Sequence, residues 1–314
     1  MIQSLAKKLR IFPFLLFCFL ASCTVKESWH STTFIFFDTV CEVKVFCSSS
    51  KFKAAQDEVF QTFSDIEHYF SPDAKDSSSP VVLDLFRKAM DIYRSSDGCF
   101  DITVAPLSRI WGFLNHSNYV PSQQEIKSIL NRISMEKIEE KNGALILLPG
   151  MELDWGGIAK GFGIDLASQS LMKMEIPNGF INAGGDLFCW GLNPDNKPWQ
   201  IGIKHPRKSG FFGVLSITEV GATTTGDYQR FFEVNGIRYH HVFNPKTGYP
   251  ARGKQSVTVI GPETAICDAL STALFVSEEP EAILQKYPQY GAIIVDSEGN
   301  ISIIGKDYDF RFIY

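Results

Sequence analysis

The stretch from residue 181 to residue 250 carries the residue types of this chain best suited to chemistry. It begins with Ile-Asn-Ala-Gly-Gly at 181–185, contains Thr-Thr-Thr-Gly-Asp-Tyr at 223–228 and ends with His-His-Val-Phe-Asn-Pro-Lys-Thr-Gly-Tyr-Pro at 240–250. Glycine clusters let backbone N–H groups approach a ligand closely, and side chains such as His241 and Asp227 can move protons. The combination predicts a site that holds a phosphorylated ligand and acts on it.

A second motif, Asp-Trp-Gly-Gly-Ile-Ala-Lys-Gly at 154–161, predicts the end of a strand, a turn through two glycines and the start of a helix. A helix N-terminus offers unpaired N–H groups and the positive end of a dipole, which suits a pyrophosphate. Asp154 is placed to orient a ligand or metal, and Lys160 to pair with a phosphate. The alternative is a tight turn with Asp154 as an N-cap, because the motif is neither a dinucleotide fingerprint nor a P-loop.

A third motif, Asp-Ala-Leu-Ser-Thr at 268–272, lies on an expected helix. Asp268 and Thr272 are four residues apart and therefore face the same way. Carboxylate and hydroxyl oxygens are hard ligands of the kind that Mg²⁺ prefers. Taken alone, such a pair is more often an ordinary i,i+4 side-chain contact on a helix.

Taken in chain order, these motifs resemble the FAD:protein FMN transferases, the ApbE family. The resemblance runs through 98–107, 154–161, 182–186, 224–228, 241–250 and 268–272, and it extends from about residue 33 to 305. It implies an α+β, T-fold-related flavin transferase fold. It also implies binding of FAD and Mg²⁺, transfer of FMN onto a Thr or Ser hydroxyl of a target protein, and release of AMP.

The resemblance also implies roles for individual residues, by motif matching. Positions matching FAD contacts are Cys99, Phe100, Asp101, Asp154, Lys160 and, through its backbone, Phe243. Positions matching the Mg²⁺ site are Gly157 through its carbonyl, Asp268, Ser271 and Thr272. His241 matches the histidine of the family pattern and is the expected base for the acceptor hydroxyl, whereas His240 occupies a variable position. A base with a near-neutral pKa suits this step; the alternative is a structural histidine in a turn.

Two departures from the family pattern concern the flavin ring. Phe-Asp-Thr at 37–39 stands where the family often has Met-Gly-Thr, and the family's Phe-Ser-x-Tyr-x-x-x-Ser segment is shortened to Phe-Ser-Pro-Asp at 70–73. The residue that stacks on the isoalloxazine is therefore not identified by the motifs.

Two further functions remain open from the sequence. A periplasmic FAD pyrophosphatase would use the same metal site and water to split FAD into FMN and AMP. A non-catalytic flavin-binding lipoprotein would need the glycines and aromatic residues but no base. For the transferase, the resemblance implies acceptors such as subunits of the Na⁺-translocating NADH:quinone reductase or other exported flavoproteins.

Residue patterns along the rest of the chain mix helices and strands without a regular βαβ alternation, which predicts an α+β fold with largely antiparallel sheets and packed helices. The expected helices are 52–70, 81–93, 121–133, 158–174, 264–276 and 281–286. The expected strands are 33–46 as a strand or hairpin, a hairpin of 144–148 with 152–154, then 180–182, 199–204, 214–217, 230–234, 237–242, 256–260 and a final hairpin of 292–295 with 301–304.

The N-terminus resembles the signal of a bacterial lipoprotein. Lys7, Lys8 and Arg10 precede an apolar run at 11–20 that is too short to span a bilayer, and Leu-Ala-Ser precedes Cys23 as in a lipobox. We therefore expect a signal peptide at 1–22, a tether at 23–32 that begins with lipidated Cys23, and a catalytic domain at 33–314. The protein would be anchored on the periplasmic side of the inner membrane, with the outer membrane and a plain secretory signal as alternatives.

The net charge and the cysteine pattern argue against a nucleic-acid-binding protein and against a zinc or thioredoxin-type site. Removal of residues 1–22 takes three basic residues and no acidic residue, so the formal net charge moves from −5 to −8, which argues against a nucleic-acid partner. The five cysteines that remain besides Cys23 form no C-x-x-C pair, which argues against a zinc or thioredoxin-type site. Most lie among apolar residues and are expected to be free thiols, although one disulfide stays open for an exported protein.

Replacement of Cys23 by Ser tests the anchor. The variant should accumulate as a soluble or an unprocessed exported protein, because it lacks the thiol that accepts the lipid. Cell fractionation with a high-salt membrane wash checks this. A processed Cys23→Ser form that still sediments with membranes after the wash would contradict the lipid anchor.

Overall fold

An eight-stranded, entirely antiparallel sheet forms the centre of the computed structural model, which describes residues 26–71, 77–114 and 117–313. The predicted signal peptide and Cys23 lie outside these residues. In spatial order the strands are β1 (Glu27–Phe36), β2 (Thr39–Ser48), β5 (Asn178–Ala183), β6 (Asp186–Trp190), β9 (Val220–Gly226), β12 (Lys254–Gly261), β13 (Gly291–Asp296) and β14 (Ile301–Gly305).

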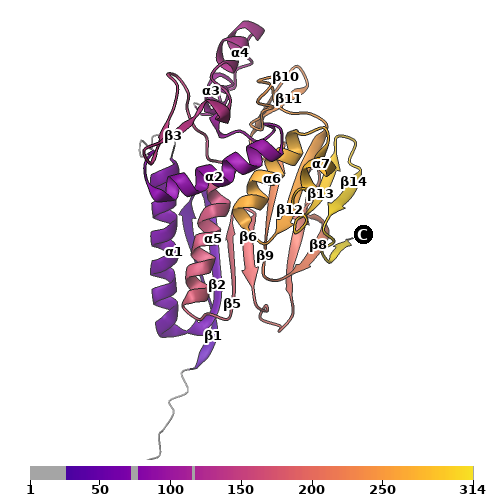
Figure 1. Cartoon of the computed structure of the whole chain (residues 1–314). Helices are drawn as coiled ribbons and strands as arrows, with labels where there is room; N and C mark the ends of the chain where they lie inside the picture. The colour runs from indigo at the N-terminus through magenta and orange to yellow at the C-terminus, as the bar shows by residue number, and fades with distance from the viewer. Residues whose placement is uncertain (1–25, 72–76, 115–116, 314) are drawn as a thin grey trace, which may run out of the picture.

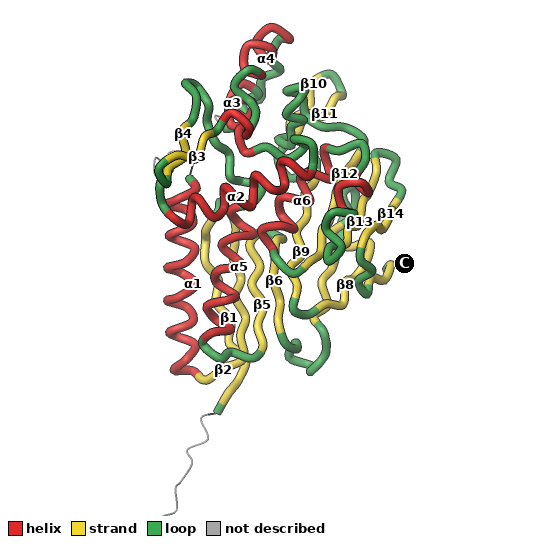
Figure 2. The backbone as a smooth tube through the Cα atoms, in the orientation of Figure 1, coloured by secondary structure: helices red, strands yellow, loops and turns green. Residues whose placement is uncertain are grey.

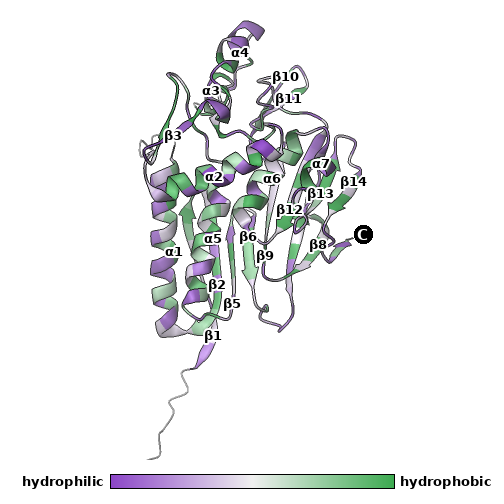
Figure 3. Ribbon diagram, viewed as in Figure 1, coloured by the Kyte–Doolittle hydropathy of each residue, from purple (hydrophilic) through white to green (hydrophobic). Residues whose placement is uncertain are grey.

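Helices cover one face of this sheet (Figures 1 and 2). They are α1 (Ser49–Phe70), α2 (Pro80–Ser95), α5 (Ala159–Lys173), α6 (Thr264–Val276) and α7 (Pro280–Leu284). Helix α1 packs on β1 and β2, α5 on β5 and β6, and α6 on β9 and β12. Apolar residues concentrate on the sides of these elements that face one another (Figure 3), so the helices bury the largest core of the protein against the sheet.

A smaller sheet covers part of the other face. It consists of β7 (Trp199–Lys204), β8 (Phe211–Ile217) and β15 (Phe310–Phe312), in the order β15-β8-β7. Strand β6 shows the result: Phe188 and Trp190 point into the core under the helices, whereas Leu187 and Cys189 point into the core under the small sheet. The central strands are therefore buried on both faces.

The remaining elements gather at one end of the molecule, where α3, α4 and the β10–β11 hairpin project beyond the sheet (Figure 1). They are α3 (Ala105–Ile110), α4 (Gln123–Leu130), β10 (Phe231–Val234) and β11 (Ile237–His240), with β3 (Glu139–Lys141), β4 (Ala144–Ile146) and two short 3₁₀ turns, η1 (Ile102–Val104) and η2 (Met135–Lys137). Helix α4 begins at Ser122, whose side chain forms the predicted capping box with Glu125.

The α+β class with largely antiparallel sheets is confirmed, but other expectations differ from the structure. Residues 27–32, expected in a tether, belong to β1 and pair with β2. The expected hairpin of 144–148 with 152–154 is wrong, because β4 pairs with β3 around Asn142 and Gly143, which both have positive φ. Elements that were not expected are α3, β3, β6, β9 and β15.

Helices α5 and α6 approach each other unusually closely, and two residues of α5 make this possible. A Cβ on Gly161 would lie 2.5 Å from the backbone oxygen of Thr264, so no larger residue fits there. The carboxylate of Asp165 accepts hydrogen bonds from the backbone N–H groups of Thr264 (2.8 Å) and Ala265 (2.9 Å). Asp165 thus satisfies the first donors of α6, for which Glu263 provides no side-chain cap.

All five cysteines of the described residues are unpaired, and four of them are buried. Within the same residues, no helix has both the length and the apolar character that a membrane crossing requires.

Replacement of Asp165 by Asn should lower the free energy of unfolding by about 2–3 kcal/mol, because an amide cannot accept both bonds and loses the charge that strengthens them. Urea unfolding at pH 8 checks this, since burial raises the pKa of Asp165 to about 6 and the carboxylate is ionised at pH 8. Asp57→Asn, on the exposed face of α1 beside Lys53, is the matched control and should cost less than about 0.5 kcal/mol. Equal losses would contradict the capping role.

Candidate functional site

Three charged side chains meet where the N-terminus of α5 reaches β6 and α6. The ammonium of Lys160 lies 2.8 Å from Asp186 Oδ2 and 3.6 Å from Asp268 Oδ2, and it donates to the carbonyl of Gly156 at 3.2 Å. The side chains of Asp186 and Asp268 are 9% and 7% exposed, so both carboxylates are nearly excluded from water, whereas Lys160 is 26% exposed. Lys160 and Asp268 were predicted site residues, whereas no role was predicted for Asp186.

The pKa values of Lys160 and Asp268 depend on both burial and the neighbouring charges. Burial alone would lower the pKa of Lys160, but Asp186 and Asp268 more than offset this and raise it above its usual value. Burial raises the pKa of the Asp268 carboxyl, while Lys160 lowers it and Asp186 raises it further. The Asp268 carboxyl is therefore easier to protonate than an exposed aspartate.

A chain of hydroxyl groups lies beside Asp268. Ser271 Oγ donates to the Asp268 carbonyl at 2.8 Å, so its single proton is used. Thr225 Oγ1, on β9, is 2.6 Å from Ser271 Oγ and 3.2 Å from Thr272 Oγ1. Thr225 must then donate to Ser271 and accept from Thr272, which leaves lone pairs on the Thr272 oxygen. The sequence analysis gave Thr225 no role.

Gly157 lies directly against this cluster. A Cβ on Gly157 would lie 3.3 Å from Thr272 Oγ1 and 3.3 Å from Cε2 of Phe100. The structure thus brings together all four positions expected to hold Mg²⁺, and the donors they offer are hard oxygens of the kind that Mg²⁺ takes. Among the described residues, no group of three or more His, Cys, Asp or Glu side chains could hold a metal.

The turn before α5 is held by Asp154. Its Oδ1 accepts from the Gly156 N–H at 2.9 Å, its Oδ2 accepts from Ser108 Oγ at 3.3 Å, and its own N–H donates to the Ile102 carbonyl at 2.6 Å. The strand expected before this turn does not form. Asp154 therefore fixes the loop that carries Gly156 and Gly157.

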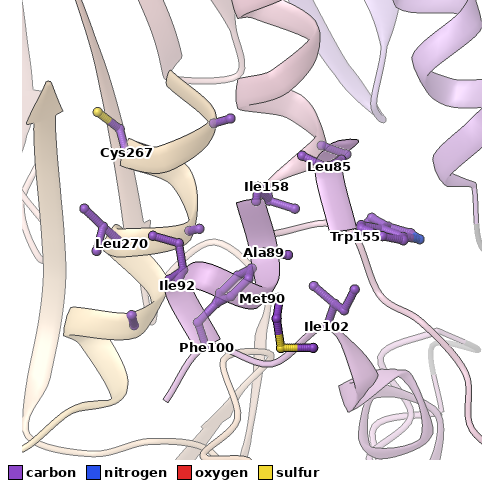
Figure 4. Packing of buried hydrophobic residues seen from close by; sticks show 14 of the residues in the cluster. Leu85, Ala89, Met90, Ile92, Phe100, Ile102, Trp155, Ile158, Cys267 and Leu270 are labelled. Atoms are coloured by element: carbon purple, nitrogen blue, oxygen red, sulfur yellow. The ribbon is translucent and has the colours of Figure 1, made fainter. Parts of the chain in front are cut away.

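The segment Cys99–Asp101 lies beside Gly157, which its Phe100 ring contacts. Phe100 is buried among residues of α2 and α6 (Figure 4), and its ring supports Gly157. Asp101 is the N-cap of η1: its carboxylate accepts from the N–H (2.8 Å) and hydroxyl (2.6 Å) of Thr103, and burial raises its pKa. A cavity of about 440 Å³ opens beside this segment, lined by Tyr93, Arg94, Asp97, Gly98, Asp101, Leu130, Ile133, Ser134, Glu136, Pro245 and Lys246.

The two histidines have different surroundings. His240 is buried; its Nε2 donates to the Ala251 carbonyl at 2.8 Å and its Nδ1 accepts from the Val242 N–H at 3.3 Å, so both nitrogens are used within the protein. Burial lowers its pKa to about 4. His241 is partly exposed, and its Nδ1 lies 3.2 Å from the carbonyl of Arg230, which requires the proton to be on Nδ1. Its Nε2 is then an acceptor, as a base must be.

Nearby cations act on His241 as well. Burial first, and then the guanidinium of Arg230, lower the pKa of His241, with a smaller effect from Lys160. The imidazole is therefore neutral at pH 7. Next to it, Phe243 packs on Trp111 and Phe113 and forms a backbone bridge with Pro250, so this segment is fixed by a tight turn.

The fold and this cluster define an α+β protein whose candidate site lies at the N-terminus of α5, between β6 and α6. Residues 37–294 match the model of the ApbE family. A relative from Treponema pallidum (strain Nichols) named FAD:protein FMN transferase is 29% identical over 320 residues, which cover 88% of this chain and 88% of the relative.

Solved structures of ApbE proteins have a similar fold. The ApbE protein from Thermotoga maritima superposes with a TM-score of 0.79 at 30% identity and covers 88% of this chain and 97% of its own. The flavin transferase ApbE from Vibrio cholerae has a TM-score of 0.79 at 23% identity, with 90% and 98% covered, and supports the fold. The chain belongs to the ApbE family, and this membership makes it a transferase enzyme that acts in flavin transfer.

A pair of threonine variants on β9 tests the hydroxyl chain. Thr225→Val should lower flavin turnover about tenfold or more, because it removes the partner that orients Ser271 and Thr272. Thr224→Val is the matched control: it removes a 2.8 Å hydroxyl contact with Thr258 on the other side of β9. Both variants should lose about 1 kcal/mol of stability, and only Thr225→Val should lose activity. Equal activity in the two would show that Thr225 does not serve the site.

Proposed function

We propose that this chain is a Mg²⁺-dependent FAD:protein FMN transferase that moves FMN from FAD onto a Thr or Ser hydroxyl of an exported or membrane flavoprotein. The bond that breaks joins the bridging pyrophosphate oxygen to the FMN phosphorus. The acceptor oxygen bonds to that phosphorus, and AMP leaves with the bridging oxygen. The observation that carries this proposal is the cluster of Gly157, Asp268, Ser271 and Thr272 at the N-terminus of α5, where the Lys160 ammonium lies 3.6 Å from Asp268.

The proposed metal ligands are the Gly157 carbonyl, the Asp268 carboxylate and the hydroxyls of Ser271 and Thr272. Mg²⁺ bound there would neutralise charge on the phosphate oxygens, which is the main requirement of phosphoryl transfer. Lys160 is proposed to contact the pyrophosphate together with the first N–H groups of α5, as anions at helix N-termini do. Asp154, the segment Cys99–Asp101 and the Phe243 backbone are the remaining proposed FAD contacts.

The acceptor hydroxyl must lose its proton, and His241 is the proposed base. Its Nδ1 proton is held by the Arg230 carbonyl, which orients the ring and leaves Nε2 to accept. Burial and the nearby cations lower its pKa and keep it neutral, and the negative charge of a bound pyrophosphate would offset part of the effect of the cations. His240 is committed to the backbone on the opposite side of the chain.

The proposed location is the periplasmic side of the inner membrane, through lipid on Cys23. The basic residues, the short apolar run and the Leu-Ala-Ser-Cys sequence support this location. Acceptors on that side, such as subunits of the Na⁺-translocating NADH:quinone reductase, are the proposed protein partners.

A single assay separates this function from the two alternatives. The mature domain is incubated with FAD, MgCl₂ and a candidate acceptor protein, and products are resolved by mass spectrometry and chromatography. Acceptor that gains one FMN, with an equal amount of AMP, is the expected result, and EDTA should abolish it. Free FMN with AMP and an unmodified acceptor would indicate a pyrophosphatase, and intact FAD a binding protein.

The histidine pair gives a sharper test of the base. His241→Ala should lower the transfer rate by about 10²–10⁴-fold, the range that general-base catalysis supplies, while FAD affinity stays nearly unchanged. His240→Ala should leave the transfer rate within about tenfold, and its main loss should be in stability. Rates and FAD affinities of both variants decide between the two histidines. Loss of FAD binding in His241→Ala, or equal rate losses, would identify His241 as structural.

A further inference from the structure

The ammonium of Lys160 lies near two carboxylates but is hydrogen-bonded to only one of them. Its ammonium contacts Asp186 at 2.8 Å and the Gly156 carbonyl at 3.2 Å, but it remains 3.6 Å from Asp268, beyond hydrogen-bond distance. Asp268 instead accepts from the N–H of Gly161 at 3.3 Å. The lysine is thus bonded to the carboxylate outside the proposed metal site and only near the carboxylate inside it.

Asp186 is rigidly placed for this contact. It is the first residue of β6 and pairs with Ala183 across a turn formed by Gly184 and Gly185, both with positive φ. The side chain of Asn182 holds the turn by accepting from the Gly185 N–H at 2.8 Å. A Cβ on Gly184 would lie 2.7 Å from Thr39 Oγ1, so the β1–β2 hairpin packs directly on this turn.

From this arrangement we infer that Asp186 is a positioning residue that holds the Lys160 ammonium away from Asp268 and so keeps Asp268 available to a divalent cation. This inference rests on the proposed metal site. A buried ammonium needs a carboxylate partner, and Asp186 and Asp268 are the carboxylates within 4 Å of it in the described structure. Without Asp186, Lys160 would close the short remaining gap, pair with Asp268 and compete with the metal for it.

The effect of Asp186 on Mg²⁺ affinity should depend on Lys160. A residue that binds the metal directly would act independently of Lys160. Asp186→Asn should raise the Mg²⁺ dissociation constant of the metal-free enzyme at least about tenfold, as loss of an outer partner of a metal site does. In a Lys160→Met background, the same Asp186→Asn change should alter the dissociation constant less than about threefold, because the competing ammonium is absent. Asp186→Glu should restore part of the wild-type affinity.

Isothermal titration calorimetry with MgCl₂ on the wild type, both single variants and the double variant measures this cycle without any turnover. Thermal unfolding of each metal-free variant establishes that it folds. Equal weakening by Asp186→Asn in both backgrounds would overturn the inference, since Asp186 would then act on the metal directly, as a ligand or a charge. Unchanged affinity in Asp186→Asn would overturn it as well.

An Asp268→Asn variant separates this inference from the proposed function. Its Mg²⁺ binding should be lost. Retained binding in Asp268→Asn would refute the metal site itself, and with it the role given to Asp186. Lost binding in Asp268→Asn, together with an uncoupled Asp186 and Lys160, would leave the metal site in place and refute only the positioning role.

Discussion

The site depends on the close contact between α5 and α6. Gly161 allows the two backbones to touch, and Asp165 ties the N-terminus of α6 to the side of α5. This contact puts the first turn of α5, with Lys160, against the residues of α6 that begin at Asp268. A larger residue at 161 would separate the cation from the carboxylate by pushing the helices apart, so the packing of two helices sets the electrostatics of the site.

The residues expected to hold Mg²⁺ and phosphate were predicted through the family resemblance, because each motif alone is ambiguous and only their order along the chain indicates a common site. The spacing of Asp268 and Thr272 places them on one face of a helix. The capping box of Ser122 and Glu125 predicted the start of α4. The fold class followed in the same way from mixed patterns without βαβ alternation, and the structure confirms it.

What the sequence did not reveal involves contacts between distant segments. Strand β9 reads Val-Gly-Ala-Thr-Thr-Thr-Gly, which lacks both alternation and large β-branched apolar residues, because it is buried on both faces beneath closely packed neighbours. Strand β6 has five residues, all of them buried, so it shows no alternation of polar and apolar residues either. Without these strands, nothing in the sequence links Asp186 to Lys160 or Thr225 to Ser271. Conversely, Pro149 and Gly150 suggested a hairpin, but Asn142 and Gly143 form the turn instead.

With the proposed lipid on Cys23, the orientation of β1 would limit which of the proposed acceptors the enzyme could reach. The chain enters the domain at Glu27 and runs ten residues, about 33 Å, to the hairpin tip that packs beside the site (Figure 1). Only three residues separate Cys23 from Glu27, which allows about 10 Å of slack. With lipid on Cys23, an upright domain would present its site some tens of ångströms above the bilayer. Acceptor hydroxyls in domains that project well clear of the membrane would meet it directly, whereas those at the lipid surface would require the whole domain to lie on its side.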